Sequence, residues 1–351
     1  MDDSSLEFDS PQRYSRQVRF APLGQAGQDR LRTASAAFVG CGALGSVIAN
    51  LLVRAGVGHV RLIDRDLVEL SNLQRQSLFD ENDVAQGLPK AVAAANRLAQ
   101  INRGVNVEPM VVDVNSKNVQ ELCQGADVIL DGTDNFDIRF LIYHLSIATD
   151  TPWVYGGCLG AEGQTMTIVP GQTACLNCLM LDGPPPPGTT PTCDSFGILA
   201  PIINVIGAMQ AMEALKILSG NAGSVSRQLR VVSLWDNQLR QLDVSGLAAA
   251  VDCPTCDQKQ FQWLDGKRET DAVVLCGRDA VQLRFPQTTP PDLAELARRL
   301  TDQGQVVVNE YLLRYREGAL TLSLFLDGRA IVSGTGDPSV ARALYTRCVG
   351  H

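Results

Sequence analysis

The stretch AAFVGCGALGSVIANLLVRAGVGHVRLIDRD, residues 36–66, predicts a strand, a glycine-rich turn, a helix and a second strand in close succession. In such a turn Gly40 permits the tight bend, Gly42 lets the backbone approach a phosphate, and Gly45 lets the helix pack on the strand. Asp64 ends the second strand, where a carboxylate can accept hydrogen bonds from a ribose. The stretch therefore predicts a nucleotide site, although a tight turn whose glycines serve packing alone has the same pattern.

The rest of the chain continues the alternation of strands and single helices. This order is typical of a Rossmann-like, doubly wound and mostly parallel α/β sheet. From about residue 265 the pattern changes to short strands, a hairpin over 311–326 and two helices. We therefore expect two domains, residues 1–264 with a helical arm over 12–34, and a small α+β domain over 265–351.

Composition excludes several classes of protein. The 351 residues carry a net charge of -8 and a pI near 5.0, which argues against a nucleic-acid partner because phosphate-backbone binding depends on clustered Lys and Arg. The acidic start MDDSSLEFDS lacks the features of a signal peptide, and no uncharged apolar stretch is long enough to span a membrane. We expect a soluble cytoplasmic protein that binds small molecules or other proteins.

Two pairs of cysteines have the spacing of zinc knuckles. Cys175 and Cys178 form one CxxC pair, and Cys253 and Cys256 form the other. Two such pairs complete a tetrahedral site of four cysteines, whose thiolates leave no position open for a substrate. The sequence therefore predicts a structural Zn²⁺ site, the alternative being a redox dithiol in one of the pairs.

Polar residues that follow the predicted strands decide which nucleotide is bound. A triphosphate attacked at its α-phosphorus needs more positive charge than a dinucleotide, together with a metal. Arg75 and Lys90 can supply that charge, and Asp131 and Asp134 can hold Mg²⁺, which prefers carboxylate oxygens. By pattern alone, charged residues of this kind more often lie on a solvated surface than in a binding site.

A set of motifs in a fixed order resembles the ThiF/MoeB family, the adenylyltransferases related to ubiquitin-activating enzymes. The resemblance runs from about residue 12 to 262. The motifs are RYSRQ (13–17), GCGALG (40–45), the strand-end Asp64, SNLQRQ (71–76), GLPK (87–90), DGTDN (131–135), both CxxC pairs and VIGAMQAMEALK (205–216).

This resemblance implies bound ATP rather than a dinucleotide. Asp64 would hold the ribose, Asn72, Arg75 and Lys90 the phosphates, and Asp134 the Mg²⁺. Arg16 would reach the γ-phosphate of the ATP bound by a second subunit, so the resemblance implies a homodimer. Cys193 lies where some members of the family use a cysteine to take up sulfur or acyl groups and others need none.

The implied activity is adenylation of the C-terminal carboxylate of a ubiquitin-like sulfur-carrier protein that ends in Gly-Gly, with release of pyrophosphate. Two alternatives stay open. One is a non-catalytic subunit that binds nucleotide and partner, and the other is an NAD-dependent dehydrogenase. The sequence does not identify the carrier or its pathway, and for the domain over 265–351 it leaves carrier docking and dimer support open.

Overall fold

The computed structural model describes residues 11–180, 196–268, 272–275, 279–283 and 290–350. The chain divides into two compact units, Met1–Lys267 and Arg268–His351, and each is described by itself. The division falls three residues beyond the domain end expected at residue 264.

The first unit is built on an eight-stranded sheet in the order β3-β2-β1-β4-β5-β6-β7-β8. The first five strands in this order pair in parallel, and β6, β7 and β8 continue the sheet antiparallel. This is the mostly parallel α/β sheet that the sequence predicts. The strands span Ser35–Val39 (β1), His59–Ile63 (β2), Asn106–Met110 (β3), Val128–Asp131 (β4), Trp153–Leu159 (β5), Glu162–Ile168 (β6), Gln228–Ser233 (β7) and Gln238–Asp243 (β8).

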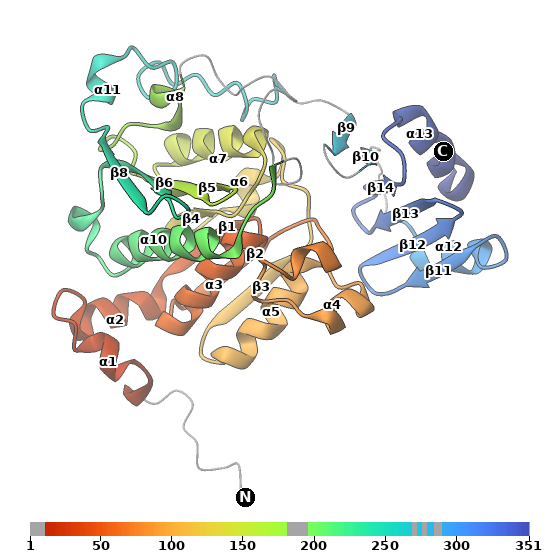
Figure 1. Cartoon of the computed structure of the whole chain (residues 1–351), viewed down its shortest axis with the longest axis horizontal. Helices are drawn as coiled ribbons and strands as arrows, with labels where there is room; N and C mark the ends of the chain where they lie inside the picture. The colour runs from red at the N-terminus through yellow and green to blue at the C-terminus, as the bar shows by residue number, and fades with distance from the viewer. Residues whose placement is uncertain (1–10, 181–195, 269–271, 276–278, 284–289, 351) are drawn as a thin grey trace, which may run out of the picture. The chain divides into compact units, whose positions relative to one another are not determined.

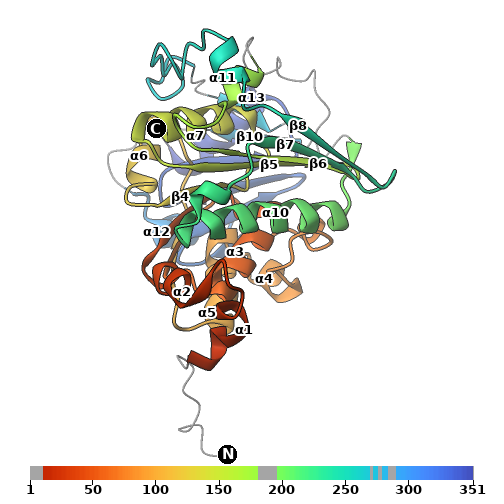
Figure 2. The same ribbon diagram turned by 90° about the vertical axis from the view of Figure 1, so that its left-hand side faces the viewer.

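Helices cover both faces of this sheet, so the central parallel strands β1, β4 and β5 are buried on both sides, whereas the edge strand β3 is partly exposed. One face packs on α3, α5 and α10, and the other packs on α6, α7 and the segment around α8, as Figures 1 and 2 show. Alternate residues of β1 enter the two cores: Phe38 faces α3 and Val39 faces α7. The helices span Ala43–Ala55 (α3), Glu81–Gln86 (α4), Lys90–Ile101 (α5), Val119–Leu122 (α6), Phe136–Thr149 (α7), Leu176–Leu179 (α8), Ala200–Leu218 (α10) and Leu247–Ala250 (α11), with 3-10 turns at Leu70–Asn72 (η3) and Ala222–Ser224 (η4).

The expected N-terminal arm is interrupted rather than continuous. It consists of η2 (Pro11–Tyr14), α1 (Ser15–Val18) and α2 (Gly24–Thr33). Pro22 lacks an N–H group and Gly24 has φ of +57°, so the chain turns between α1 and α2. Gln17 ties the arm to the sheet unit, because its Nε2 donates to Gln28 Oε1 at 2.7 Å and to the Ala55 carbonyl at 3.0 Å.

Helix α10 is the one described helix that is long and apolar enough to cross a membrane by length and composition. The sequence analysis predicts no such stretch, because Glu213 and Lys216 interrupt the apolar run. In the structure α10 lies along the sheet, where Ile202, Ile203 and Ile206 are fully buried in the core shared with α3. Its apolar character is thus accounted for by packing inside the first unit.

In its described residues, the second unit is a six-stranded antiparallel sheet with two helices. The strand order is β11-β12-β13-β14-β10-β9, and β14 was not expected from the sequence. Leu296, Leu300 and Leu344 of the two helices bury against Leu313 and Leu322 of the sheet. The elements span Ala272–Leu275 (β9), Ala280–Leu283 (β10), Leu293–Leu300 (α12), Gln305–Val308 (β11), Leu312–Glu317 (β12), Leu320–Phe325 (β13), Ala330–Ser333 (β14) and Pro338–Val349 (α13).

Candidate functional site

The glycine-rich turn joins β1 to α3 through closely packed backbone. Gly40 has φ of +92°, and a Cβ on Gly45 or Gly132 would lie 2.2 or 2.1 Å from the Gly40 carbonyl oxygen. A Cβ on Gly42, in contrast, would meet nothing closer than Nε2 of Gln76, at 3.7 Å. Within the described part of the chain, no side-chain hydrogen bond caps the start of α3 at Gly42. One side of Gly42 is therefore open, and an anion can approach the first N–H groups of the helix there.

Gly45→Ala is expected to lower the free energy of unfolding by about 1–3 kcal/mol, because the new methyl group overlaps the Gly40 carbonyl. Urea denaturation measures the change. The matched control is Gly223→Ala, where a Cβ meets no atom within 4 Å. The free energy of unfolding of this variant should equal that of the wild type. Equal midpoints for Gly45→Ala and the wild type would contradict the close packing of the turn.

Asp64 follows β2 and fixes the turn against the end of that strand. The Cys41 N–H donates to Asp64 Oδ2 at 2.7 Å, and the Asp66 N–H donates to Oδ1 at 2.7 Å. Burial raises the pKa of Asp64, while the positive charge of Lys90 lowers it. Each carboxylate oxygen retains acceptor capacity, so Asp64 can still bind a ligand hydroxyl.

The connection from β2 to α5 carries three of the predicted phosphate ligands. Lys90 begins α5 with its side chain buried, and its Nζ lies 3.0 Å from Asp66 Oδ2. Asn72 is also buried, and its Oδ1 accepts the Glu69 N–H at 3.1 Å. Arg75 is half-buried and donates to the Ser71 carbonyl at 2.8 Å. These contacts hold an amide and two cations in the segment that lies beside the turn.

The DGTDN segment after β4 contains a buried ion pair. Asp131 is fully buried, and its Oδ2 accepts from Arg139 Nε at 3.1 Å. Its Oδ1 accepts from the N–H and the hydroxyl of Thr133, at 2.9 and 2.8 Å. Burial raises the pKa of Asp131 and Arg139 lowers it. Asp131 is therefore held in an internal ion pair with Arg139, whereas Asp134 is exposed, and the expectation that Asp131 holds Mg²⁺ stays a prediction.

Arg139 also ties this segment to the neighbouring strand. Its Nη2 donates to the carbonyls of Thr133 and Gly156, at 2.7 and 3.0 Å. Arg139→Met removes these bonds and leaves the Asp131 carboxylate buried without its counterion. We expect a loss of about 3–5 kcal/mol in the free energy of unfolding, measured by chemical denaturation.

The control for Arg139→Met is a surface pair on the same unit. Lys267 lies 2.9 Å from Asp265 and its side chain is 69% exposed. Lys267→Met should change the free energy of unfolding by no more than about 1 kcal/mol. Equal losses for the two variants would contradict a special role for the buried pair.

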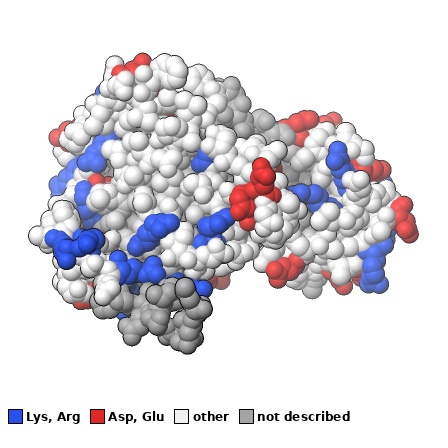
Figure 3. Space-filling model, turned by 60° about the horizontal axis from the view of Figure 1, so that its bottom comes forward, with Lys and Arg blue, Asp and Glu red and all other residues white. Residues whose placement is uncertain are grey.

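Arg16 lies on α1 with its side chain exposed. It is one of several exposed arginines, and Figure 3 shows Lys and Arg gathered on the face that carries the N-terminal helices. Five of its six exposed arginines lie between residues 13 and 32, although the net charge of the whole chain is negative. The exposed arginines of this region are Arg13, Arg16, Arg19, Arg30, Arg32 and Arg54.

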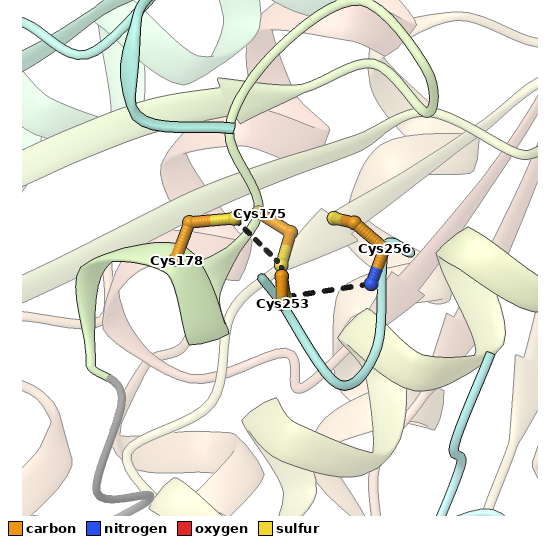
Figure 4. Close-up of side chains that lie close together, drawn as sticks. All are labelled: Cys175, Cys178, Cys253 and Cys256. Carbon is orange, nitrogen blue, oxygen red and sulfur yellow. Dashed lines mark hydrogen bonds between the residues drawn. The ribbon is translucent and has the colours of Figure 1, made fainter. Parts of the chain in front are cut away.

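The two CxxC pairs come together in a four-cysteine cluster. Figure 4 shows Cys175 and Cys178, from the start of α8, beside Cys253 and Cys256. All four Sγ atoms lie within 4.8 Å of one another, and Cys175 Sγ is 3.7 Å from Cys178 Sγ and 3.6 Å from Cys253 Sγ. A tetrahedral zinc ion with Zn–S bonds of about 2.3 Å requires sulfur separations of roughly 3.8 Å. The cluster therefore fits Zn²⁺ and, with four protein ligands, has no open position.

The remaining predicted residue, Cys193, lies outside the described residues. Conversely, the structure draws attention to Gln76 and Arg139, to which the sequence analysis gave no role. Gln76 lies inside the SNLQRQ motif, so the motif marks the segment but not the residue's contacts. The sequence does not indicate the ion pair of Arg139, because its partner Asp131 can be interpreted equally well as a metal ligand.

Comparisons with known proteins agree with this geometry. The model of the ThiF family matches residues 14–255. The sulfur carrier protein ThiS adenylyltransferase of Bacillus subtilis (strain 168) is 43% identical over 339 residues, which cover 96% of this chain and 99% of that protein. The sulfur carrier protein adenylyltransferase of Thermus thermophilus is 34% identical over 270 residues, 76% of this chain and 96% of that one.

Among solved structures, E. coli MccB with ATP is similar to this chain with a TM-score of 0.59. It is 22% identical, and the match covers 68% of this chain and 74% of the other, so it supports the fold alone. The resemblance inferred from the motifs is confirmed by the family match and by the relatives: the chain belongs to the ThiF family.

Proposed function

We propose that this protein uses ATP to adenylate the C-terminal carboxylate of a ubiquitin-like sulfur-carrier protein. The observation that carries the proposal is the open helix start at Gly42 with the buried cation Lys90 and the strand-end Asp64 beside it. The printed names of relatives that match nearly the whole chain support the same activity. These relatives give no support to an NAD-dependent dehydrogenase.

The residues divide between the parts of the nucleotide. Asp64 binds the ribose, and Asn72, Arg75 and Lys90 bind the phosphates. Asp134 holds Mg²⁺, which adds positive charge at the phosphates when bound. Arg16 extends from α1 to the nucleotide of a second copy of the chain, so the active enzyme is a homodimer, and its exposed position on a basic face supports this role.

The reaction needs positive charge more than a general base. A terminal carboxylate is ionised at neutral pH, so its oxygen attacks the α-phosphorus directly and pyrophosphate leaves. Negative charge grows on the phosphate oxygens as the new bond forms. Lys90, Arg75 and the start of α3 offset that charge, and a carrier tail that ends in Gly-Gly is narrow enough to reach the α-phosphorus.

The four cysteines hold Zn²⁺ and take no part in the chemistry. Zinc bound to four thiolates has no free position for a substrate, so its role is to fix the two loops that it joins. We further propose that the enzyme acts in the cytoplasm and that the unit from Arg268 onward helps to dock the carrier. The match to the Bacillus subtilis relative extends through most of that unit, whereas the family model ends at residue 255.

Carrier-dependent exchange of labelled pyrophosphate into ATP tests the proposal. The purified protein with Mg²⁺ and a sulfur carrier that ends in Gly-Gly should support exchange, and the same carrier without its last glycine should not. No exchange with any such carrier, despite ATP binding, would favour a non-catalytic subunit.

A further inference from the structure

A chain of buried polar side chains joins helix α7 to the second cysteine pair. Tyr143 and His144 of α7 are 1% and 4% exposed. Thr255 is 2% exposed and lies between Cys253 and Cys256, the two cysteines of the pair. Tyr143 Oη lies 2.5 Å from Thr255 Oγ1 and 2.9 Å from His144 Nε2. Packing alone does not require these polar groups, because apolar side chains of the same shape fill a core equally well.

The hydrogen bonds of His144 fix the direction of this chain. The Trp263 N–H donates to His144 Nδ1 at 3.2 Å, so the hydrogen of the neutral ring lies on Nε2. Burial lowers the pKa of His144 to about 4, which keeps the ring neutral at pH 7. His144 Nε2 therefore donates to Tyr143 Oη, and the Tyr143 hydroxyl donates to Thr255 Oγ1. The Thr255 hydroxyl is left to donate to the Gln260 carbonyl at 3.5 Å, so every hydrogen in the chain has an acceptor.

Thr255 is a point at which α7 holds the second cysteine pair. Within the turn of the pair, the Cys256 N–H donates to Cys253 Sγ at 3.4 Å, and the Asp257 N–H donates to the Cys253 carbonyl at 3.0 Å. These bonds shape the turn, but they do not connect it to α7. Thr255 is next to Cys256 and two residues after Cys253, so a displacement of Thr255 would move both sulfur atoms relative to the first pair.

We propose that Tyr143 and His144 are positioning residues of the zinc site. Tyr143 holds Thr255 in place, and His144 orients the Tyr143 hydroxyl, so that the second cysteine pair keeps the geometry that retains Zn²⁺. Loss of such hydrogen bonds outside the ligand set commonly weakens metal binding by about 10-fold to 100-fold. The inference rests on the zinc site proposed above, and it gives a role to a histidine that the adenylation reaction does not use.

The test measures how fast the full chain releases zinc to a chromophoric chelator. Tyr143→Phe and Thr255→Val each remove one hydroxyl group of the same hydrogen bond. We expect each variant to release zinc about tenfold faster than the wild type. The double variant should release it no faster than the faster single variant, because both substitutions remove the same bond. Thr255→Ser keeps the hydroxyl group and should release zinc at the wild-type rate.

The matched control is Tyr155→Phe. Tyr155 is also buried in the core beside α7, but its hydroxyl group accepts from Gln164 Nε2 at 2.7 Å, outside the cysteine cluster. This variant should release zinc like the wild type even if its melting temperature falls.

Three results would overturn the positioning role. They are wild-type release by Tyr143→Phe and Thr255→Val, equally fast release by Tyr155→Phe, and multiplied effects in the double variant. A wild type that holds no zinc would instead overturn the zinc site itself, before any variant is compared.

Discussion

Lys90→Met is expected to reduce carrier-dependent ATP–pyrophosphate exchange by about 100-fold to 1,000-fold. The Lys90 side chain is 4% exposed and its ammonium is held 3.0 Å from Asp66 Oδ2, so its charge is fixed beside the turn rather than free in solvent. Negative charge that develops on the phosphates then meets a cation already in place. Exchange of labelled pyrophosphate into ATP, at saturating carrier, measures the loss.

The matched control lies on the same helix. Arg97 is 43% exposed and pairs with Asp80, so Arg97→Met removes a cation from α5 without affecting the turn. Exchange by this variant should stay within about twofold of the wild type, since exposed pairs contribute little. Arg75→Ala and Asp134→Ala should behave like Lys90→Met. Wild-type exchange in all three would exclude the assigned phosphate and Mg²⁺ roles.

Removal of zinc is expected to destabilise the first unit strongly. Without the ion, four thiol groups that are mostly buried remain close together with only weak hydrogen bonds between them. Structural zinc sites contribute directly to the free energy of folding. We expect Cys253→Ser to lose the ion and at least about 3 kcal/mol of stability, a decrease in melting temperature of roughly 6–12 °C.

Metal analysis and calorimetry together check this expectation. The wild type should contain one zinc ion per chain, and a strong chelator should lower its melting temperature to that of Cys253→Ser. Cys158→Ser, which changes a partly buried thiol outside the cluster, should keep the full zinc content. A metal-free wild type with undiminished stability would refute a structural site.

Sequence reasoning succeeded where local pattern and tertiary packing agree. The apolar pattern of the sequence predicts a strand over 128–131 and helices over 90–101 and 293–300, and the structure has these elements at the same bounds. The strand is a short run of buried residues, and the two helices have apolar residues on the side that faces a core. Strand β8 was missed, since every one of its residues is exposed at the edge of the sheet and no apolar alternation marks it.

Helix α10 shows where periodicity is only partly right. The spacing of Met209, Met212 and Leu215 predicts packing against the core or a second subunit, or else a substrate groove, with Gln210 and Glu213 pointing elsewhere. In the structure Met209 and Leu215 pack against the core and Met212 is 54% exposed, whereas Gln210 and Glu213 are buried. Gln210 Nε2 donates to the carbonyls of Asp131 and Val154, at 3.0 and 3.2 Å. Polar residues can thus occupy the inner face of a helix when strand carbonyls receive them, which one-dimensional pattern does not reveal.

The sequence predicts which segments form the candidate site, but it does not predict which of their charged residues pair with one another. The motifs identify the turn, the CxxC pairs and the charged connection. Of the two carboxylates Asp131 and Asp134, it is Asp131 that forms an internal ion pair, because Arg139 of the following helix α7 contacts it. Only the folded structure shows this contact. For the same reason the sequence does not reveal that Gln76 Oε1 lacks a hydrogen-bond partner among the residues that the structure describes.

The four-cysteine cluster also joins two distant parts of the chain near one edge of the sheet. Cys175 and Cys253 are 78 positions apart, and the chain between them includes α10 on one face and β7 and β8 at the margin. A zinc ion bound there would close this stretch into a ring that starts and ends on the face of α7. A single protease cut inside the ring would then leave the two fragments joined through the metal as well as through the packing of α10 and the pairing of β6 with β7.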